Sequence, residues 1–322
     1  MPGAECDAPI PGVHAVKDPG IKNLPASIHQ KLLNNARKTN RPFFEVLQYF
    51  AIERFLYRLS KSPYADKFVL KGALMFSVWK PGLPRPTKDI DFLGRTNNDL
   101  NAIVRIMKGI CSIKAGSDGL VFTPGSVAGE RITEHSDYQG VRVYFWAGLG
   151  KARVSMQVDV GFGDIVVPGA QNISYPAILD MPEPVLKGYS RESVIAEKLE
   201  AMIKLDIINS RMKDFFDVWL LARQFDFKGA TLAKAIKETF RHRKTAIIKE
   251  PHMLADDFKT DKTKQAQWRA FLRKNKLTVA PADFAEVVSG IAGFVKPVLS
   301  ALADGKDFPA VWKAAGSWKN AP

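Results

Sequence analysis

Two aspartates separated by one residue, Asp89 and Asp91, are the residues of this sequence whose spacing most directly suggests chemistry. The short run 89–93 alternates in polarity and is predicted to be a strand, in which residues i and i+2 share a face. Both carboxylates then point one way, while Ile90 and Phe92 point into the core. Two ionised carboxylates so placed repel each other, and a divalent cation between them removes the repulsion. The pattern therefore predicts a Mg²⁺ site, although a solvated strand face has the same spacing.

A third carboxylate is available at Asp159, the last polar residue of the alternating run 153–160. On that strand Val154, Val158 and their neighbours form one face, and Asp159 ends the polar face. It could join the metal site, or it could deprotonate an attacking hydroxyl. An ordinary exposed aspartate at a strand end is an equal alternative.

The residues that precede the acid pair are candidates for contacts with a nucleotide. An apolar run ends at Lys71 and Gly72, and a glycine lets backbone N–H groups approach a phosphate closely. Arg85 could hold a phosphate, and Thr87 could orient the metal-binding pair through its hydroxyl. A helix packed on the core with an exposed arginine explains the same residues without a ligand.

A lysine at position 198 lies inside an apolar helical stripe. Helical spacing over 190–202 places Glu197, Glu200 and Lys204 on the opposite side. The stripe consists of Val194, Ile195, Leu199 and Met202. A lysine that faces the core is costly unless it is paired, and a triphosphate or an active-site carboxylate would be a sufficient partner. The alternative is a lysine whose ammonium reaches solvent at the edge of the core.

The segment 211–219 places Asp214 and Asp217 on one helical face, three residues apart. This polar face could meet the base of a nucleotide or Lys198. The alternative is that both acids occupy the first turn of a helix, where the helix dipole favours them. For Asp217 this alternative is the preferred interpretation.

The elements that must position these residues follow from hydrophobic periodicity. Helical spacing runs from Ser27 to Leu56 with a break near Pro42, and again over 100–112. A short helix or a strand–helix passage is predicted over 64–77, and the chain is predicted to be helical from Ser190 to its end. The predicted strands, besides 89–93, are 119–123, 131–133, 141–147, 153–160 and 164–167. Strands in the middle with helices at both ends predict an α+β fold.

Composition and charge limit the class of protein. With 322 residues, 46% hydrophobic content and 25% charged residues, the chain is expected to fold around a sizeable core. Only Cys6 and Cys111 are present, so neither a disulfide framework nor a zinc site is expected. No signal peptide and no uninterrupted apolar span are found, which indicates a cytoplasmic protein without a membrane segment.

The net charge of +14 and the pI of about 9.6 favour a polyanionic partner such as a nucleic acid. Residues 187–319 contain 25 Lys and Arg against 16 Asp and Glu, a net charge of +9. The C-terminal half therefore carries most of the positive charge, as expected if it holds an RNA backbone. A charge that serves only solubility is the alternative.

Four segments taken in order resemble the AbiEii family of nucleotidyltransferase toxins. They are Leu70-Lys71-Gly72, Arg85-Pro86-Thr87-Lys88-Asp89-Ile90-Asp91-Phe92, Glu197-Lys198 and Arg211-Met212-Lys213-Asp214-Phe215-Phe216-Asp217. The resemblance spans residues 68–221. It implies a polymerase-β-like nucleotidyltransferase core with a mixed sheet and N-terminal helices over 26–187, after an extended leader over 1–25, and a helical C-terminal domain over 188–322. It also implies Mg²⁺, a nucleoside triphosphate and a separate antitoxin protein, and in some members tRNA 3′ ends receive the nucleotide.

The resemblance also implies roles for individual residues. Asp89 and Asp91 would bind the metal, and we expect Asp159 to be the third acid there. Lys198 would hold the triphosphate, and Asp214 would be a late catalytic acid–base or a residue that contacts the base. The remaining nucleotide contacts are assigned to Lys71, Gly72, Arg85, Thr87 and Arg211. The family commonly has Gly-Gly or Gly-Ser where this chain has Gly72-Ala73, which removes a small polar contact to phosphate.

We therefore expect a Mg²⁺-dependent enzyme, the toxin of a toxin–antitoxin system, that transfers a nucleotide from a nucleoside triphosphate to RNA, with tRNA as the expected acceptor. Two alternatives stay open. One is a catalytically inactive nucleotidyltransferase-like module that binds RNA or protein, which the Gly72-Ala73 departure favours. The other is a nucleotidyltransferase whose acceptor is a protein or a small molecule.

Overall fold

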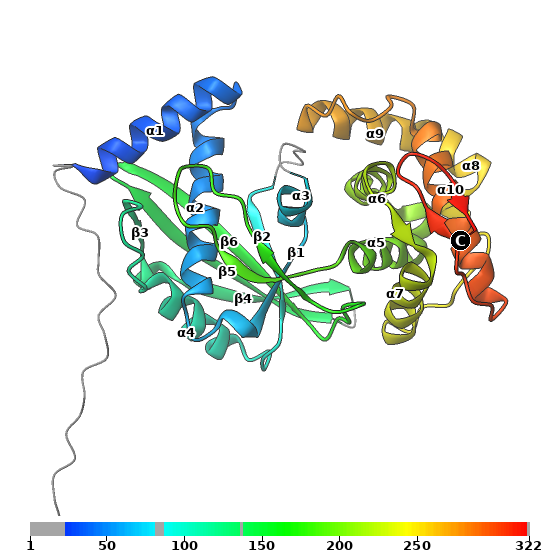
Figure 1. The fold of residues 1–322 in the computed structure, drawn as a ribbon, viewed down its shortest axis with the longest axis horizontal. Helices are drawn as coiled ribbons and strands as arrows, with labels where there is room; N and C mark the ends of the chain where they lie inside the picture. Colours follow the sequence, from blue (N-terminus) through cyan, green and yellow to red (C-terminus); the bar gives the residue numbers. More distant parts are fainter. Residues whose placement is uncertain (1–22, 81–86, 136–137, 321–322) are drawn as a thin grey trace, which may run out of the picture.

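The computed structural model describes residues 23–80, 87–135 and 138–320. Figure 1 shows a half that contains a large sheet with the first four helices, and a second half built mainly from the remaining helices. The alternating apolar segments of the sequence form the sheet, and the segments with helical period cover it or form the second half. The architecture is α+β with a mixed sheet, N-terminal helices and a helical C-terminal region, which confirms the predicted fold class.

The large sheet has eight strands in the order β3-β5-β6-β2-β1-β8-β7, with β4 paired to β5. Two pairings are parallel, β2 with β6 and β1 with β8, and the others are antiparallel. The strands are β1 (Phe68–Lys71), β2 (Asp89–Gly94), β3 (Leu120–Phe122), β4 (Ala128–His135), β5 (Tyr138–Leu149), β6 (Ala152–Phe162), β7 (Gln171–Ser174) and β8 (Val185–Gly188). The acid pair thus begins a strand near the centre of the sheet.

Three helices of the first half cover one face of the sheet. The helices of this half are α1 (Leu24–Thr39), α2 (Phe43–Ser60), α3 (Leu74–Trp79) and α4 (Leu100–Cys111). Asn40 ends α1 in the left-handed conformation and Pro42 precedes α2, which explains the predicted break between them. Asp99 caps α4 by accepting a hydrogen bond from the Ala102 N–H at 2.7 Å. Apolar side chains of α1, α2 and α4 pack with the inner face of the strands in one core.

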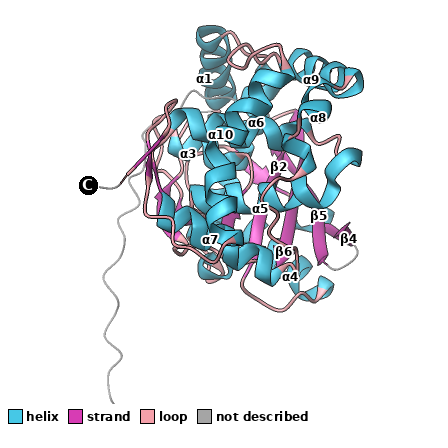
Figure 2. Ribbon diagram, turned by 90° about the vertical axis from the view of Figure 1, so that its right-hand side faces the viewer, coloured by secondary structure: helices cyan, strands magenta, loops and turns pink. Residues whose placement is uncertain are grey.

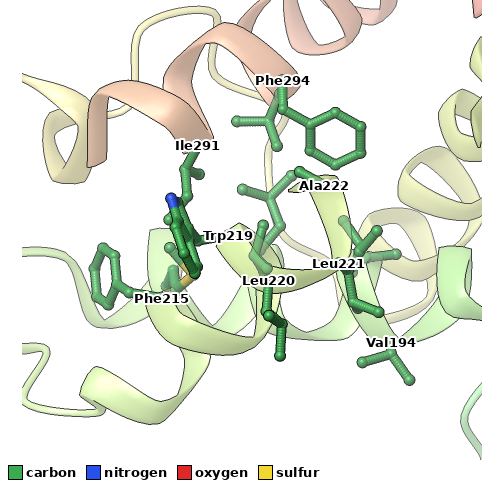
Figure 3. Packing of buried hydrophobic residues seen from close by; sticks show 14 of the residues in the cluster. Val194, Phe215, Trp219, Leu220, Leu221, Ala222, Ile291 and Phe294 are labelled. Atoms are coloured by element: carbon green, nitrogen blue, oxygen red, sulfur yellow. The ribbon is translucent and has the colours of Figure 1, made fainter. Parts of the chain in front are cut away.

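The second half has six helices: α5 (Arg191–Leu205), α6 (Met212–Gln224), α7 (Gly229–His242), α8 (Asp256–Thr260), α9 (Lys262–Asn275) and α10 (Phe284–Ala303). Its core is formed around α5, α6 and α10, and Figure 3 shows Trp219 beside Ile291 and Ala222 near Phe294. A small sheet in the order β11-β10-β9 closes this half, with β9 (Phe227–Lys228), β10 (Val311–Trp312) and β11 (Trp318–Lys319). The prediction of helix to the end of the chain is therefore wrong at these short strands.

Strands β1 and β2 contribute to both cores because their side chains alternate between faces. Leu70 and Phe92 pack in the core of the first half, whereas Val69 and Leu93 pack in the core of the second half. Figure 2, viewed from the side of the second half, shows α5, α6 and α10 in front of the strands. Asp89 and Asp91 share the face of β2 that carries Leu93, because the three residues are spaced two apart. This face is turned toward the helical half.

Other predicted elements need correction. The run 164–167 is not a strand, and β7 and β8 were missed because each has only four residues. Helix α1 begins at Leu24, inside the predicted leader, while residues 1–22, including Cys6, lie outside the described residues. The predicted boundary at 187/188 falls inside β8, one residue before that strand ends, and stays a prediction.

One helix in the described part of the chain, α10, is long and apolar enough to cross a membrane by length and composition alone. Val287, Ile291 and Val298 on this helix are fully buried among the other helices. The apolar character of α10 is therefore accounted for by its position inside the core of the second half.

Candidate active site

A cavity of about 760 Å³ lies where the sheet face meets the helical half. Strand β2 contributes Asp89 and Asp91, α2 contributes Gln48 and Tyr49, and α6 contributes Lys213. The other lining residues are Phe44, Glu45, Thr87, Lys88, Arg142, Arg153, Val154, Ser155, Asp159 and Asn275. The two acids that the sequence singled out therefore face a cavity, and cationic side chains share it.

The carboxylates of this cavity come together through the pairing of β2 with β6. In the parallel register Asp91 lies opposite Asp159, and Asp89 lies opposite Gln157. Burial raises the pKa of Asp89, and the charge of Asp159 raises it further, while Arg142 and Lys213 act in the opposite direction. The site thus concentrates negative charge at Asp89, which a cation would stabilise.

Asp159 is held by an arginine that the sequence did not single out. Arg142 on β5 donates from Nε and Nη2 to the two carboxylate oxygens, at 2.8 and 2.7 Å, and the two residues are register partners. In residues 23–80, 87–135 and 138–320, no three acidic, His or Cys side chains are grouped closely enough to form a metal site. The third metal ligand predicted at Asp159 stays a prediction, and its side chain makes a bidentate ion pair instead. Arg142 lies between the apolar residues Val141 and Val143 of its strand, just as Asp159 lies between Val158 and Val160. This alternation is the sequence signal that could have identified Arg142.

Gly72 lies directly against the carboxylate of Asp91. Its φ is +72°, a left-handed conformation that favours glycine, and a Cβ built there would fall 2.1 Å from Asp91 Oδ2. Any other residue at position 72 would require the Asp91 side chain to shift. The glycine that was predicted to let backbone approach a phosphate therefore lets the backbone approach the acid pair.

Lys71 is the register partner of Asp91, and Thr87 precedes Asp89 by two residues. Both side chains contact groups other than the two carboxylates. The Lys71 ammonium is 3.0 Å from Asp164 and 3.5 Å from Glu197. The Thr87 N–H donates to the Tyr49 hydroxyl at 3.0 Å, and the Thr87 hydroxyl accepts from the Asp89 N–H at 3.3 Å. Thr87 thus fixes the start of β2 through its backbone rather than through a carboxylate. Arg85 lies outside the described residues.

Lys198 on α5 lies in a buried ionic cluster with the first turns of α6. Its ammonium is 2.7 Å from Asp214 and 2.8 Å from Asp217, and both acids are fully buried. Arg211 contacts Asp214 from the other side at 2.7 Å. Burial opposes ionisation of Asp214, but Lys198 and Arg211 outweigh it and hold its pKa below the usual value. The sequence predicted either a triphosphate or a carboxylate as the partner of Lys198. The structure gives it two carboxylates, and its role toward the triphosphate stays a prediction.

The contacts of Lys198 change the interpretation of Asp217 and of Lys198 itself, and the cluster adjoins the cavity through Lys213. Asp217 is not merely an acid favoured by the helix dipole, because it contacts Lys198 directly. Lys198 does not line the cavity, whereas Lys213, next to Asp214 in the first turn of α6, does. The cluster therefore fixes the turn that presents Lys213 to Asp89.

A second ionic network joins the two halves and was missed by the sequence analysis. Arg243 Nη2 contacts Asp164 at 2.8 Å and Glu197 at 3.4 Å, and its Nη1 contacts Glu200 at 2.9 Å. Lys71 contacts two of the same acids. Glu197 and Glu200 lie opposite the apolar stripe of α5, as predicted, but both contact Arg243 of the segment after α7 and Glu200 is buried, whereas Lys204 on the same side is exposed. Arg243 was hidden in the basic run 241–244, which resembles a solvated surface.

One family model and two solved structures are similar to this chain. The family model described as "Nucleotidyl transferase AbiEii toxin, Type IV TA system" matches residues 54–290, more than half of the chain. Among curated proteins no sequence match is significant. Two solved structures from Helicobacter pylori are similar. JHP933 has 15% identity and a TM-score of 0.44, with 89% of this chain and 97% of that chain covered. A candidate nucleotidyltransferase has 17% identity and a TM-score of 0.43, with 86% and 97% covered.

Proposed function

This chain belongs to the AbiEii family of nucleotidyltransferase toxins of type IV toxin–antitoxin systems, and from that premise we propose that it transfers a nucleotide from a nucleoside triphosphate to RNA in a Mg²⁺-dependent reaction. Membership makes the chain a nucleotidyltransferase with a triphosphate substrate and an antitoxin partner. The metal, the RNA acceptor, expected to be tRNA, and the role of each residue belong to the proposal.

The cavity at the junction of the two halves is the observation that carries this proposal. Asp89 and Asp91 lie on its floor, and Lys213, Arg142 and Arg153 share its lining. Nucleotidyl transfer needs carboxylates for a metal ion beside cations for phosphate oxygens. The arrangement supplies both in a cavity of about 760 Å³, a volume within the usual range for small-molecule sites.

The donor set at β2 fits Mg²⁺. In nucleotide sites this ion is usually held by one or two carboxylates together with substrate phosphates, so it does not need an all-protein cage. Asp89 and Asp91 provide two carboxylates on one face, and burial and Asp159 raise the pKa of Asp89, which indicates uncompensated negative charge there. When bound between Asp89 and Asp91, the ion would neutralise charge on the transferring phosphoryl group.

The chain's own residues would bind the triphosphate and orient the reaction. We assign phosphate contacts to Lys213 and Arg153, because both line the cavity. Lys198 is committed to Asp214 and Asp217 and acts by positioning the first turn of α6. In the reaction an acceptor hydroxyl forms a bond to the α-phosphorus, the bond to the β-phosphate oxygen breaks, pyrophosphate leaves, and the hydroxyl proton passes to a carboxylate or to water.

We predict that Asp91→Asn lowers nucleotide transfer about 100- to 1,000-fold, an effect comparable to loss of one group that stabilises the transition state. Asparagine preserves the size of the side chain against Gly72, so folding should be retained. The assay uses purified protein, Mg²⁺, total tRNA and each of the four triphosphates labelled in the α-phosphate. The matched control is Asp180→Asn, an exposed aspartate away from the cavity.

Three outcomes separate the possibilities. Label that enters RNA with the wild type and the control but not with Asp91→Asn supports the proposal. Transfer that requires Asp91 but labels only a protein or a small molecule would replace the RNA acceptor. Calorimetry that detects no Asp91-dependent binding of Mg²⁺ and triphosphate, together with no transfer, would indicate an inactive binding module.

A further inference from the structure

Aromatic side chains are exposed on the sheet face that continues outward from the acid pair. Strands β5 and β6 extend beyond the start of β2, since Asp89 pairs with Gln157 and β6 begins at Ala152. Tyr144, level with Asp89 at the start of this extension, and Trp146, further along it, are 36% and 41% exposed. Their register partners on β6 are Gln157 and Ser155. Exposed apolar side chains that gather on one face, rather than scattered singly, mark candidate interaction sites.

The exposed tryptophan adjoins the cavity through an arginine. The Arg153 guanidinium lies 4.9 Å from the centre of the Trp146 ring, and Arg153 and Ser155 also line the cavity that contains Asp89. Trp146 is four residues from Arg142 along β5, or about 13 Å at the usual rise of a strand. A chain that reaches the acid pair along this face would therefore pass over the stack of Trp146 and Arg153.

The opposite wall of the cavity is basic. Asn275, at the end of α9, lines the cavity together with Lys213. Arg273 and Lys274, in the last turn of α9, are exposed beside it. Figure 1 shows one end of α9 pointing toward α1 and α2. Glu130 on the neighbouring strand β4 is acidic, and its carboxylate accepts a hydrogen bond from the Tyr144 hydroxyl at 2.9 Å.

We infer that this extension, defined by Tyr144, Trp146 and Arg153, binds the single-stranded end of the RNA acceptor, with a base stacked on the Trp146–Arg153 pair. This rests on the proposed function and names the part of the molecule that holds its acceptor. Aromatic rings and arginine planes bind unpaired bases of any sequence by stacking, while flanking cations bind the backbone. A double helix cannot offer such a face, so the occupant is an unpaired strand.

We predict that Trp146→Ala weakens binding of single-stranded RNA about 5- to 100-fold, the range expected for loss of one base–aromatic stack. Binding is measured by fluorescence anisotropy with a labelled RNA of about twelve nucleotides and with a blunt duplex of the same sequence, without Mg²⁺ or triphosphate. Trp146→Phe retains a ring and should stay within about threefold of the wild type. Val185→Ala removes an exposed apolar side chain from β8, near the opposite edge of the sheet from β5. This variant should bind RNA like the wild type.

Steady-state transfer with the same variants gives a second readout. Trp146→Ala should raise the KM for RNA and leave the KM for the triphosphate unchanged, because the ring is expected to contact only the acceptor. A raised KM for the triphosphate alone would assign the ring to the nucleotide base and overturn the inference. Unchanged affinity for the single strand in a folded Trp146→Ala protein would overturn it as well.

Failure of the inference can be distinguished from failure of the proposed function. Binding that depends on Trp146 in a protein that transfers no nucleotide would leave the RNA surface intact and refute the enzymatic proposal. Transfer to RNA that depends on Asp91 but not on Trp146 would leave the enzyme intact and refute only the acceptor surface.

Discussion

At the scale of single residues, the charge balance of Lys198 explains why a lysine is tolerated in the core. Two fully buried acids, Asp214 and Asp217, lie within 2.8 Å of its ammonium. Burial disfavours the charged form of Asp214, and the Lys198 ammonium outweighs it and holds the pKa of this carboxyl below its usual value. The lysine is therefore required by the acids as much as the acids are required by the lysine.

We predict that Lys198→Met lowers the free energy of unfolding by about 3–5 kcal/mol, because removing one partner leaves uncompensated buried charge. Methionine retains much of the apolar stem, so the effect should come mainly from the lost ammonium. The measurement is urea-induced unfolding at neutral pH. Lys204→Met, an exposed lysine in the same helix, is the control and should change stability by less than about 1 kcal/mol. Equal stabilities of the two variants would contradict this account of the cluster.

At the scale of secondary-structure elements, α2 holds the segment between β7 and β8 through buried polar groups. The Ile178 N–H donates to Glu53 at 2.7 Å, and Arg54 donates to the Pro182 carbonyl at 2.7 Å. Burial raises the pKa of Glu53 to about 7, although Arg54 and the Ile178 N–H act against this. The helix that lines the cavity with Gln48 and Tyr49 is thus fixed by a carboxyl group that titrates near neutral pH.

The raised pKa of Glu53 predicts a pH dependence with a definite sign. Folding favours the protonated carboxyl, so its contribution is fully present below the unfolded value of 4.5 and is lost as the pH rises through about 7. The difference corresponds to about 3 kcal/mol. Glu53→Gln should remove this part of the decline in the free energy of unfolding between pH 4.5 and pH 8. Glu45→Gln, at a partly exposed site on the same helix, should leave the decline unchanged, and parallel curves for Glu53→Gln and wild type would refute the assignment.

At the scale of the whole molecule, the two halves are joined by buried ions as well as by apolar contacts. Arg243 contacts Asp164, Glu197 and Glu200, and Lys71 contacts Asp164 and Glu197. These residues come from the end of β1, the segment after β6, α5 and the segment after α7. The network therefore fixes how the helical half faces the sheet, and with it the width of the cavity.

We predict that Arg243→Met lowers the free energy of unfolding by about 3–5 kcal/mol, because three acids lose a buried partner. Arg241→Met is a matched control two residues away. Arg241 pairs with Glu238, but its side chain is 70% exposed, so its loss should cost less than about 1 kcal/mol. Both values come from denaturant unfolding. A cost for Arg243→Met as small as for Arg241→Met would show that the apolar contacts alone hold the halves together.

The sequence by itself determined the features that repeat along one element. Alternation over 89–93 placed Asp89 and Asp91 on one face, and the structure shows β2 over Asp89–Gly94. Helical period placed Lys198 inside an apolar stripe and required a partner for it. The break between α1 and α2, the helix α4 and the α+β class followed from the same kind of pattern. Such features depend on backbone geometry that is the same in every helix or strand.

Only the tertiary structure decided which distant residues meet. In the folded chain Asp159 pairs with Arg142, and Gly72 packs against Asp91. Lys71 contacts Asp164 and Glu197. It also covered part of the polar side of α5, so that Glu197 and Glu200 contact Arg243, while Lys204 on the same side stays exposed. Periodicity fixes the face on which a side chain lies, but the partner of a buried charge depends on which elements pack against that face and on the cost of leaving any ion there unpaired.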